Sequence, residues 1–446
     1  MRLSFDNINV VSHADIKLDG LTVIAGENGT GKSTVGKLLF SVVKALSNLG
    51  EKKQDYKRKT IAKYIDSLYN RLSSVAVRSE NERFDQEFPL PAVKLVDSFM
   101  GIFNDNVLDD GTKVALYREK LDRMRSAIKT INRITPRESK LIEGDLNNID
   151  ICLEQTDNLA ADMMTEVRYM IESEFMNRIC SFGAGSSHVE LSMGMNGTRT
   201  EIVLENDDVI RVKVDSALKD RLEDATYVES PLYIHMLDTL LSSSTFREVS
   251  KGRLFKPSAM VPVHIKDLAE KIDASRFVPE ENSIDLMVES GGCFKFKDRT
   301  LYYEKDGKQY SPINVASGLK SFGVIQMLLE TGAISEKKLL IWDEPENHLH
   351  PKWQIVFSSV LVGLAKRGVP VLVSTHSPYF VQGIRYFSAK ENVEPFVNYY
   401  LAQASDDRML SSMVLDVTDN LNLIFSKLAT PLNDVMNVDM VRNSNA

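Results

Sequence analysis

Cysteine is scarce in this sequence of 446 residues. Its three cysteines, Cys152, Cys180 and Cys293, lie far apart and form no C-x-x-C pair. A disulfide framework and a cysteine-based zinc site are therefore not expected, and this pattern is typical of a reducing compartment.

Long hydrophobic runs are also missing. No apolar stretch approaches the roughly 20 residues that cross a bilayer, and residues 1–6 turn polar too early for a secretory leader. Hydrophobic residues make up 43% of the chain and charged residues 26%, which is ordinary for a soluble globular protein. We therefore predict a cytoplasmic protein with no membrane partner.

An excess of basic charge is absent as well, because 54 lysines and arginines face 62 acidic residues, a net charge of −8. Such a surface does not favour indiscriminate binding to nucleic acid, although it leaves room for a local basic track. Two basic clusters are each compatible with a solvated helix face or with a DNA contact. They are Lys52, Lys53, Lys57, Arg58, Lys59 and Lys63, and Arg118, Lys120, Arg123, Arg125, Lys129 and Arg133.

The region from about 50 to 180 has an almost wholly helical pattern. Apolar residues follow three- and four-residue spacing before Pro136 and a heptad rhythm after it. This predicts either a hairpin with coiled-coil packing or a helical subdomain whose apolar stripe faces a core. The spaced residues are Val114, Tyr117, Leu121, Met124, Ile128 and Ile131, then Ile142, Leu146, Ile149, Leu153, Thr156, Ala160, Met163, Val167 and Met170.

Strand patterns lie on both sides of this helical region. Residues 3–5 and 16–18 alternate like short edge strands, and the apolar run at 21–25 predicts a buried strand. Later runs flank Asn196-Gly197, a tight-turn signal, and predict a three-stranded antiparallel meander followed by further strands. These runs lie at 189–193, 202–204, 210–214, 286–288 and 293–303.

Residues 26–33 read G-E-N-G-T-G-K-S, which fits the P-loop pattern G-x-x-x-x-G-K-[ST] at every fixed position. The glycines let the backbone wrap around phosphates, and the following helix directs its positive end at the same anion. Lys32 should contact the β- and γ-phosphates of ATP, and the Ser33 hydroxyl should ligate Mg²⁺. The predicted nucleotide-binding residues are Gly26, Asn28, Gly29, Thr30, Gly31, Lys32, Ser33 and Thr34.

Two further buried strands are predicted to end in polar residues. The run L-L-I-W-D-E at 339–344 delivers two carboxylates at the end of a strand, where ligands bind in open α/β sheets. Asp343 would hold the Mg²⁺ shell, and Glu344 would polarise the attacking water. The run at 369–375 leads to His376, which could donate to the γ-phosphate and report its loss.

These motifs, together with A-S-G-L-K at 316–320, resemble the ABC-type ATPase head of the SMC, RecF and OLD group. The resemblance implies that Ser317 and Gly318 bind the γ-phosphate of an ATP held by another subunit. The pentapeptide departs from the usual L-S-G-G at its first and fourth positions and retains the serine and the glycine.

The run D-E-P-E-N-H-L-H-P at 343–351 resembles AAA-family ATPases related to OLD and RecF rather than transporter heads. In that group the segment is the D-loop at the subunit interface, so we do not expect His348 and His350 to hold a metal. A Gln-containing loop normally lies between the two halves of such a head. Residues 227–231 are the candidate for the equivalent loop.

OLD-type proteins usually carry a C-terminal Toprim nuclease, but the residues after 396 lack its glycine-flanked Glu and its Asp-x-Asp strand end. We interpret their scattered aspartates as surface charge and expect any nuclease activity to come from another protein. Stand-alone ATPases of this build resemble the ATPase subunits of the Septu (PtuA-like) and PARIS (AriA-like) anti-phage systems, where the ATPase oligomerises and controls a small effector nuclease.

The predicted fold is α/β: a split ABC/SMC-like ATPase head with a helical, partly coiled-coil insertion and an antiparallel β subdomain. The predicted parts are 1–48 with the P-loop, 49–182 as the helical insertion, 183–310 as the antiparallel β and helical part of the head, 311–400 with the signature, Walker B, D-loop and His switch, and 401–446 as a C-terminal extension.

The predicted function is that of an ATP-hydrolysing regulatory subunit in anti-phage defence. Its copies would sandwich ATP and Mg²⁺ in a homodimer or larger even-numbered oligomer and control an effector nuclease encoded nearby. Two alternatives stay open. One is a RecF- or SMC-like ATPase that binds DNA directly in repair or tethering, and the other is a nucleotide-dependent scaffold with negligible turnover.

Overall fold

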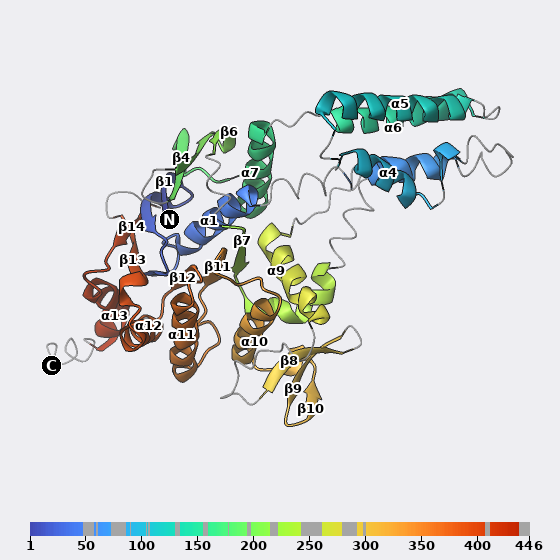
Figure 1. Cartoon of the computed structure of the whole chain (residues 1–446). Coiled ribbons are helices and arrows are strands. Elements are labelled where there is room, and N and C mark those ends of the chain that lie inside the picture. The colour runs from blue at the N-terminus through green and yellow to red at the C-terminus, as the bar shows by residue number, and fades with distance from the viewer. Residues whose placement is uncertain are drawn as a thin grey trace. The chain divides into compact units, whose positions relative to one another are not determined.

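The structure is a computed structural model of the chain (Figure 1). Two compact units are present: a head unit of Met1–Ser47 and Met163–Ala446, and a helical unit of Asn48–Asp162. The residues described are 1–47, 58, 61–72, 86–89, 91–103, 105, 108–129, 134–154, 159–176, 178–193, 198–214, 222–241, 261–278, 292–297, 300–405 and 411–436.

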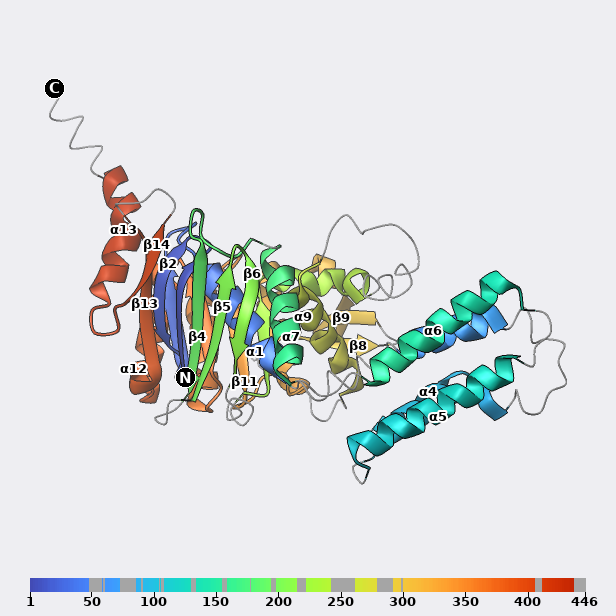
Figure 2. The same ribbon diagram turned by 90° about the horizontal axis from the view of Figure 1, so that it is seen from above.

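An 11-stranded mixed sheet forms the centre of the head unit (Figure 2). Its strand order is β6-β5-β4-β1-β2-β14-β13-β3-β12-β11-β7, which confirms the predicted α/β class. The strands are β1 (Arg2–Ile8), β2 (Val11–Lys17), β3 (Leu21–Gly26), β4 (Ser186–Met193), β5 (Thr198–Glu205), β6 (Asp208–Lys213), β7 (Asp224–Val228), β11 (Lys338–Asp343), β12 (Val371–Thr375), β13 (Val397–Ala404) and β14 (Ser412–Asp416).

Helices cover both faces of this sheet. Successive strand residues point to opposite faces, so Ile24 and Ile341 join the core on the α1 side, whereas Val23 and Trp342 join the core with α11 and α12. The helices are α1 (Lys32–Leu46), α7 (Leu159–Phe175), α9 (Val263–Ala274), α10 (Ser317–Glu330), α11 (Pro351–Lys366), α12 (Pro378–Glu391) and α13 (Asn422–Met436), with 3-10 turns η2 (Pro231–Met236), η3 (Ser275–Phe277), η5 (Pro312–Asn314) and η6 (Glu394–Phe396).

Four parallel strands, β3, β12, β11 and β7, place their carboxyl ends at one edge of the sheet. Thr375 pairs with Ala25, and Asp343 pairs with Ser374. Helix α1 packs closely beneath them, because a Cβ on Gly36 would lie 3.1 Å from Ile341 Cγ2. The fold therefore brings together the P-loop, the end of β11 with Asp343, and the end of β12, which His376 follows.

The strands at 3–5 and 16–18, predicted as edges, lie inside the sheet. β1 pairs with β4, and β2 pairs with β14, so each is flanked on both sides. The predicted meander is present as β4, β5 and β6, and it extends the main sheet instead of forming a subdomain of its own. Asn196-Gly197 and the strand predicted at 286–288 lie outside the described residues.

The boundary predicted at residue 400 falls inside β13. This strand pairs in parallel with β3, and it opposes Ala402 to Gly26 of the P-loop. β14 follows as its antiparallel neighbour and connects it to β2. Residues that we expected to extend beyond the head therefore complete its sheet, because only they fill the gap between β2 and β3.

Three helices of the helical unit, α4 (Val93–Phe103), α5 (Asp110–Lys129) and α6 (Pro136–Glu154), share one apolar core with residues 61–72 (Figure 1). The stripe predicted on α5 and α6 faces this core, so the helical subdomain is the alternative that the structure supports. The heptad spans two described helices, α6 and α7. α6 ends at Glu154. The later heptad residues Met163, Val167 and Met170 lie on α7 and belong to the head unit, where Val167 and Met170 join the core on the α1 side of the sheet.

The predicted basic clusters have different outcomes. Most of the first cluster lies outside the described residues, apart from Arg58 and Lys63. In the second, Arg123 binds Glu119 at 3.0 Å, and Arg125 binds Glu143 at 2.9 Å. These arginines are balanced by neighbouring carboxylates, which is the behaviour of a solvated helix face.

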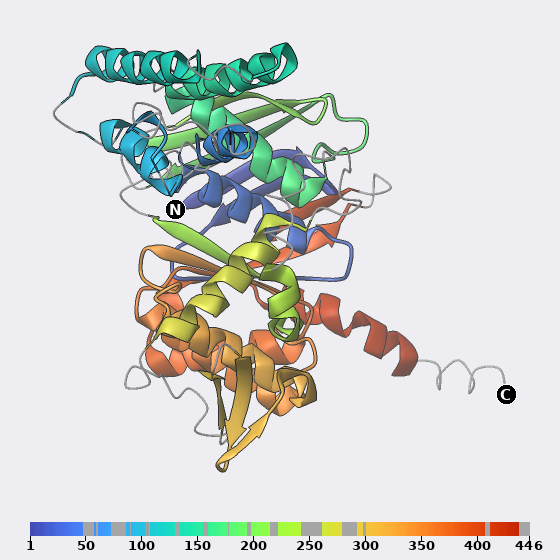
Figure 3. The same cartoon turned by 90° about the vertical axis from the view of Figure 1, so that its right-hand side faces the viewer.

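A small three-stranded sheet lies against α10 (Figure 3). It consists of β8 (Gly292–Lys297), β9 (Thr300–Lys305) and β10 (Lys308–Tyr310), which covers the strand character predicted at 293–303. Gly323 lets the two elements approach, because a Cβ there would lie 2.2 Å from Phe294 Cδ2. Gln326 Nε2 also donates to the Phe294 carbonyl at 3.3 Å.

None of the described helices is long and apolar enough to span a bilayer. The three cysteines are free, and Cys152 is buried in the core of the helical unit.

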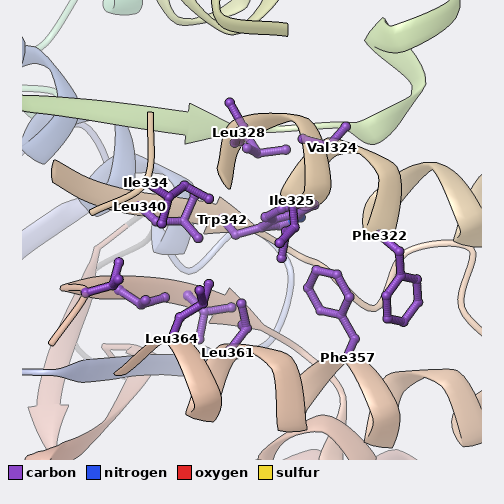
Figure 4. Close-up of a cluster of buried hydrophobic side chains, with 14 of the residues drawn as sticks. Phe322, Val324, Ile325, Leu328, Ile334, Leu340, Trp342, Phe357, Leu361 and Leu364 are labelled. Atoms are coloured by element: carbon purple, nitrogen blue, oxygen red, sulfur yellow. The ribbon is translucent and has the colours of Figure 1, made fainter. Parts of the chain in front are cut away.

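Aromatic side chains form the centre of the core beneath β11 (Figure 4). Phe357 on α11 is fully buried and contacts three rings edge-on or tilted: Phe322, Trp342 and Phe380. Ring pairs of this kind add about 0.5–1.5 kcal/mol beyond the area that they bury. Phe357 therefore joins α10, α12 and the strand that carries Asp343.

We expect Phe357→Ala to destabilise the head unit by about 3–5 kcal/mol, because truncation leaves a cavity among these rings. Urea unfolding, followed by tryptophan fluorescence, measures the change. The matched control is Tyr386→Ala on α12, whose side chain is exposed. Equal midpoints for the two variants would contradict the packing described here.

Candidate nucleotide-binding site

The P-loop links the end of β3 to the start of α1. Gly29 and Gly31 adopt positive φ values of 79° and 85°, a backbone region that glycine enters without strain. A Cβ on Gly31 would also lie 2.3 Å from Val11 Cγ2. Helix α1 begins without a side-chain cap, so its first N–H groups face the position where the motif predicts phosphate.

Two hydroxyl groups hold the P-loop in place. Thr30 Oγ1 donates to the carbonyl of Glu27 at 2.8 Å. Ser412 Oγ on β14 is 2.8 Å from the carbonyl of Thr30 and 3.0 Å from that of Val10. A strand near the end of the sequence thus supports the loop near its beginning.

Lys32 is the buried cation of the site, with 4% of its surface exposed. Its Nζ donates to the carbonyls of Gly26 and Glu27 at 2.9 and 2.8 Å, and it lies 3.8 Å from Glu344 Oε1. Burial lowers the pKa of Lys32, and the nearby carboxylates, first of all Glu344, oppose this shift. The ammonium is thus held at the mouth of the loop, where it can meet an anion.

Asp343 ends β11 and is held from two sides. Ser374 Oγ donates to one carboxylate oxygen, and the phenol of Tyr227 donates to the other at 3.0 Å. Burial raises the pKa of Tyr227, with Asp343 adding to the effect, so the phenol remains a donor. Packing behind these groups leaves a cavity of only about 10 Å³, which fixes the carboxylate in one position.

Glu344 and His376 lie opposite each other at the ends of β11 and β12. His376 Nδ1 is 3.4 Å from Glu344 Oε1. This interaction lowers the pKa of Glu344 to about 2 and raises the pKa of His376. Asn347 Nδ2 donates to the other Glu344 oxygen at 3.1 Å. The Glu344 carboxylate is therefore ionised and oriented at neutral pH.

Glu346 fixes the histidine loop from within the protein. One of its oxygens accepts from Thr375 Oγ1 at 2.6 Å and from the backbone N–H of His376 at 2.7 Å. That oxygen also lies 3.3 Å from His376 Nδ1. Burial raises the pKa of Glu346. The D-E-P-E segment thus supplies a third carboxylate, which joins the ends of β11 and β12.

The donor set at this edge fits Mg²⁺. Ser33 lies in the first turn of α1, and Asp343 ends β11, which packs against α1, so a hydroxyl and a carboxylate, the oxygen ligands that Mg²⁺ prefers, are present at the same edge. The hydrogen bonds to Asp343 from Tyr227 and Ser374 are outer-shell contacts of the kind that orient metal ligands. Ser33 and Asp343 are therefore the residues that would hold the ion.

The predicted signature residues lie beside the D-loop. A Cβ on Gly318 would lie 2.8 Å from Leu349 Cδ2 and 3.4 Å from the carbonyl of His348. Helix α10 starts at Ser317 without a side-chain cap. His350 caps α11, where its Nδ1 accepts from the N–H of Lys352 at 3.3 Å. His350, the second histidine of the H-L-H run, thus has a structural role at the start of α11.

Residues 227–231, the candidate for the Gln-loop equivalent, begin inside β7 at the same edge. Val228 pairs with Trp342, so Glu229 follows next to Asp343 in the register. Glu229 is the only acidic residue of this segment. Its Oε1 lies 3.3 Å from Lys37 Nζ of α1.

Residues 206–382 match a protein family described as "AAA domain, putative AbiEii toxin, Type IV TA system". This part of the chain is therefore similar to an AAA domain. The matched region contains β7, Ser317, Asp343, Glu344 and His376, whereas the P-loop lies before it in the sequence. Pairing of β3 with β12 joins the two parts at one edge.

The solved structures that are similar to the chain include SMC heads. One, described as an SMC head bound to the C-winged helix domain of ScpA, is 10% identical, covers 95% of this chain and 98% of its own, and has a TM-score of 0.40. The SMC head domain from Thermotoga maritima is 12% identical, with 93% and 98% covered and a TM-score of 0.35. No protein of curated function matches the sequence.

Sequence patterns found the residues at the strand ends but missed those that support them. Tyr227 lay within a proposed loop, and Ser374 lay within an apolar run, yet both bind Asp343. Glu346 belonged to the quoted D-loop motif without an assigned task. Ser412 had no local signal, because its partner Thr30 lies 382 positions away in the sequence.

We expect Tyr227→Phe to weaken Mg²⁺-dependent ATP binding by about tenfold, since it removes a donor that orients Asp343 and keeps the buried ring. Titration of ATP at several Mg²⁺ concentrations measures this change. Tyr399→Phe is the control, because it removes a buried phenol on β13 that lies outside this hydrogen-bonded group. Unchanged affinity in Tyr227→Phe would remove Tyr227 from the site.

Proposed function

We propose that this chain binds and hydrolyses ATP at the edge formed by β3, β12 and β11. The proposal rests mainly on one observation: Lys32, Glu344 and His376 converge there. Lys32 Nζ lies 3.8 Å from Glu344, and Glu344 lies 3.4 Å from His376. A buried ammonium beside an oriented carboxylate and an imidazole suits a γ-phosphate and its attacking water.

Each residue has a separate task in this mechanism. Lys32 and the first N–H groups of α1 bind the phosphates, and Ser33 and Asp343 would hold Mg²⁺, which would supply neutralisation of the phosphate charge. Glu344, ionised because of its low pKa, accepts a hydrogen bond from the attacking water and orients it. His376 donates to the γ-phosphate and loses this contact after hydrolysis.

We propose that a second copy of the chain completes the site. Ser317 and Gly318 would contact the γ-phosphate bound to the partner copy, using the amides at the uncapped start of α10. Support comes from the contact of Gly318 with the D-loop residues 348–349, which puts both predicted interface motifs on one surface. ATP would then join two heads, and hydrolysis would release them.

We further propose a regulatory role in anti-phage defence, with an effector nuclease supplied by another protein. Two observations support this role. The family that residues 206–382 match is described as "AAA domain, putative AbiEii toxin, Type IV TA system", and the motifs resemble ATPase subunits of defence systems. Arg123 and Arg125 on α5 are already paired with carboxylates, which gives no support to a DNA contact by these two arginines.

Glu344→Gln should slow ATP hydrolysis by about a hundredfold or more, because the amide cannot act as the base that orients water. ATP should remain bound, and the mass of the ATP-bound protein should be that of a stable dimer. Phosphate release and light scattering measure the two effects. The control is Glu336→Gln, an exposed acid before β11. Hydrolysis by Glu344→Gln at the parental rate would contradict the assigned mechanism.

The proposed defence role predicts a physical partner. When the chain is expressed with its neighbouring genes and purified by a tag, we expect a small nuclease to be recovered in stoichiometric amount. Mass measurement with and without ATP then shows whether nucleotide changes the assembly. Purification of the chain alone, combined with salt-sensitive DNA binding, would favour the repair or tethering alternative instead.

A further inference from the structure

His264, near the start of α9, is fully buried between two carboxylates. Its Nδ1 lies 2.5 Å from Glu174 Oε2, a side chain that is also fully buried, and its Nε2 lies 3.2 Å from Glu229 Oε2. Burial alone would lower the pKa of His264, but hydrogen bonds with Glu174 and Glu229 outweigh it and raise the pKa. When protonated, the ring can donate to both carboxylates.

Backbone contacts reinforce this connection between α7 and α9. Helix α9 has no side-chain cap from its own N-terminal residue. The end of α7 supplies the caps instead, because Ser173 Oγ accepts from the N–H of Val263 and Glu174 Oε1 accepts from the N–H of His264, both at 3.0 Å. The two helices are therefore joined by three hydrogen bonds around the buried His264.

Helix α7 has a special place along the chain. It spans Leu159–Phe175, and the division between the helical unit and the head unit falls within it, at residue 163. The chain therefore passes from one unit into the other through a helix whose last turn holds Ser173 and Glu174. Any displacement of this helix acts on the bonds to His264.

Two routes lead from His264 to the nucleotide edge. Glu229 directly follows β7, whose last residue Val228 pairs with Trp342, and it contacts Lys37 of α1 at 3.3 Å. The ring of Tyr227 meets the His264 ring edge-on, with centroids 4.7 Å apart, and the Tyr227 phenol donates to Asp343. His264 therefore contacts one side chain that binds α1 and another that orients the predicted Mg²⁺ ligand.

We propose that Glu174, His264 and Glu229 form a buried link through which α7 and the nucleotide site set each other's geometry. The inference rests on the nucleotide site proposed above. Buried ion pairs often stabilise a fold no more than apolar residues do, yet they are costly to break because one charge is left unpaired. We therefore expect a displacement of α7 to reach the nucleotide site through this link. Because coupling between two sites is reciprocal, nucleotide binding should also act on α7.

The test compares hydrogen exchange in residues 163–175 with and without a non-hydrolysable ATP analogue and Mg²⁺. In the parental chain, we expect nucleotide to change exchange in this segment by about fivefold or more. His264→Gln should remove most of that change, and it should also weaken nucleotide binding by a similar factor. Glu174→Gln cuts the link at its other end and keeps an acceptor for the His264 N–H, which guards against a folding failure of the first variant.

Asp267→Asn is the matched control. Asp267 also lies on α9 and binds Lys44 and Lys271 at 2.5 and 2.8 Å, but this buried cluster includes Asp224 at the opposite end of β7. Its loss should lower the melting temperature without changing the nucleotide response of residues 163–175. If the link had only a structural role, the control and the His264 variant would behave alike.

Three results would overturn the link while leaving the proposed ATPase intact. They are a parental chain that binds nucleotide without a response in residues 163–175, a response that persists in folded His264→Gln and Glu174→Gln, and an equal loss in Asp267→Asn. Absence of nucleotide binding by the parental chain would instead contradict the proposed function and the link together.

Discussion

Parallel pairing of β3, β12, β11 and β7 is the constraint on which the rest of this structure depends. The register aligns Ala25 with Thr375 and Asp343 with Ser374, so loops separated by more than 300 residues meet at one edge. A slip of two residues between β11 and β12 would move Glu344 by roughly 7 Å along the strand. Such a shift would break the approach of Glu344 to Lys32, which is 3.8 Å in this register. The helices on both faces hold this register, and the site follows from it.

Much of this edge could be predicted from the sequence, because its signals are local. The P-loop requires glycine where φ is positive, as at Gly29 and Gly31, and buried parallel strands show as continuous apolar runs before Asp343 and His376. Each strand end can therefore be recognised from a segment of about ten residues. The α/β class and the residues of the predicted Walker motifs follow from such signals, and the structure brings Lys32, Glu344 and His376 together.

The remaining features depend on partners far away in the sequence. β14 supports the P-loop through Ser412, and β1 and β2 lie inside the sheet only because β4 and β14 flank them. The heptad from Ile142 to Met170 could not reveal that it serves two cores, since an apolar stripe does not specify what covers it. His264 gave no pattern at all, because its two carboxylates come from α7 and from the end of β7.

In the proposed function, one chain supplies half of a composite site, with Lys32 acting on its own nucleotide and Ser317 on that of a second copy. The most direct measurement mixes Lys32→Ala with Ser317→Arg chains and follows phosphate release. Neither variant alone should hydrolyse ATP, whereas mixed dimers regain one site built from the intact P-loop of one chain and the intact Ser317 of the other. A folded mixture that stays inactive, or full activity of Ser317→Arg alone, would contradict the account.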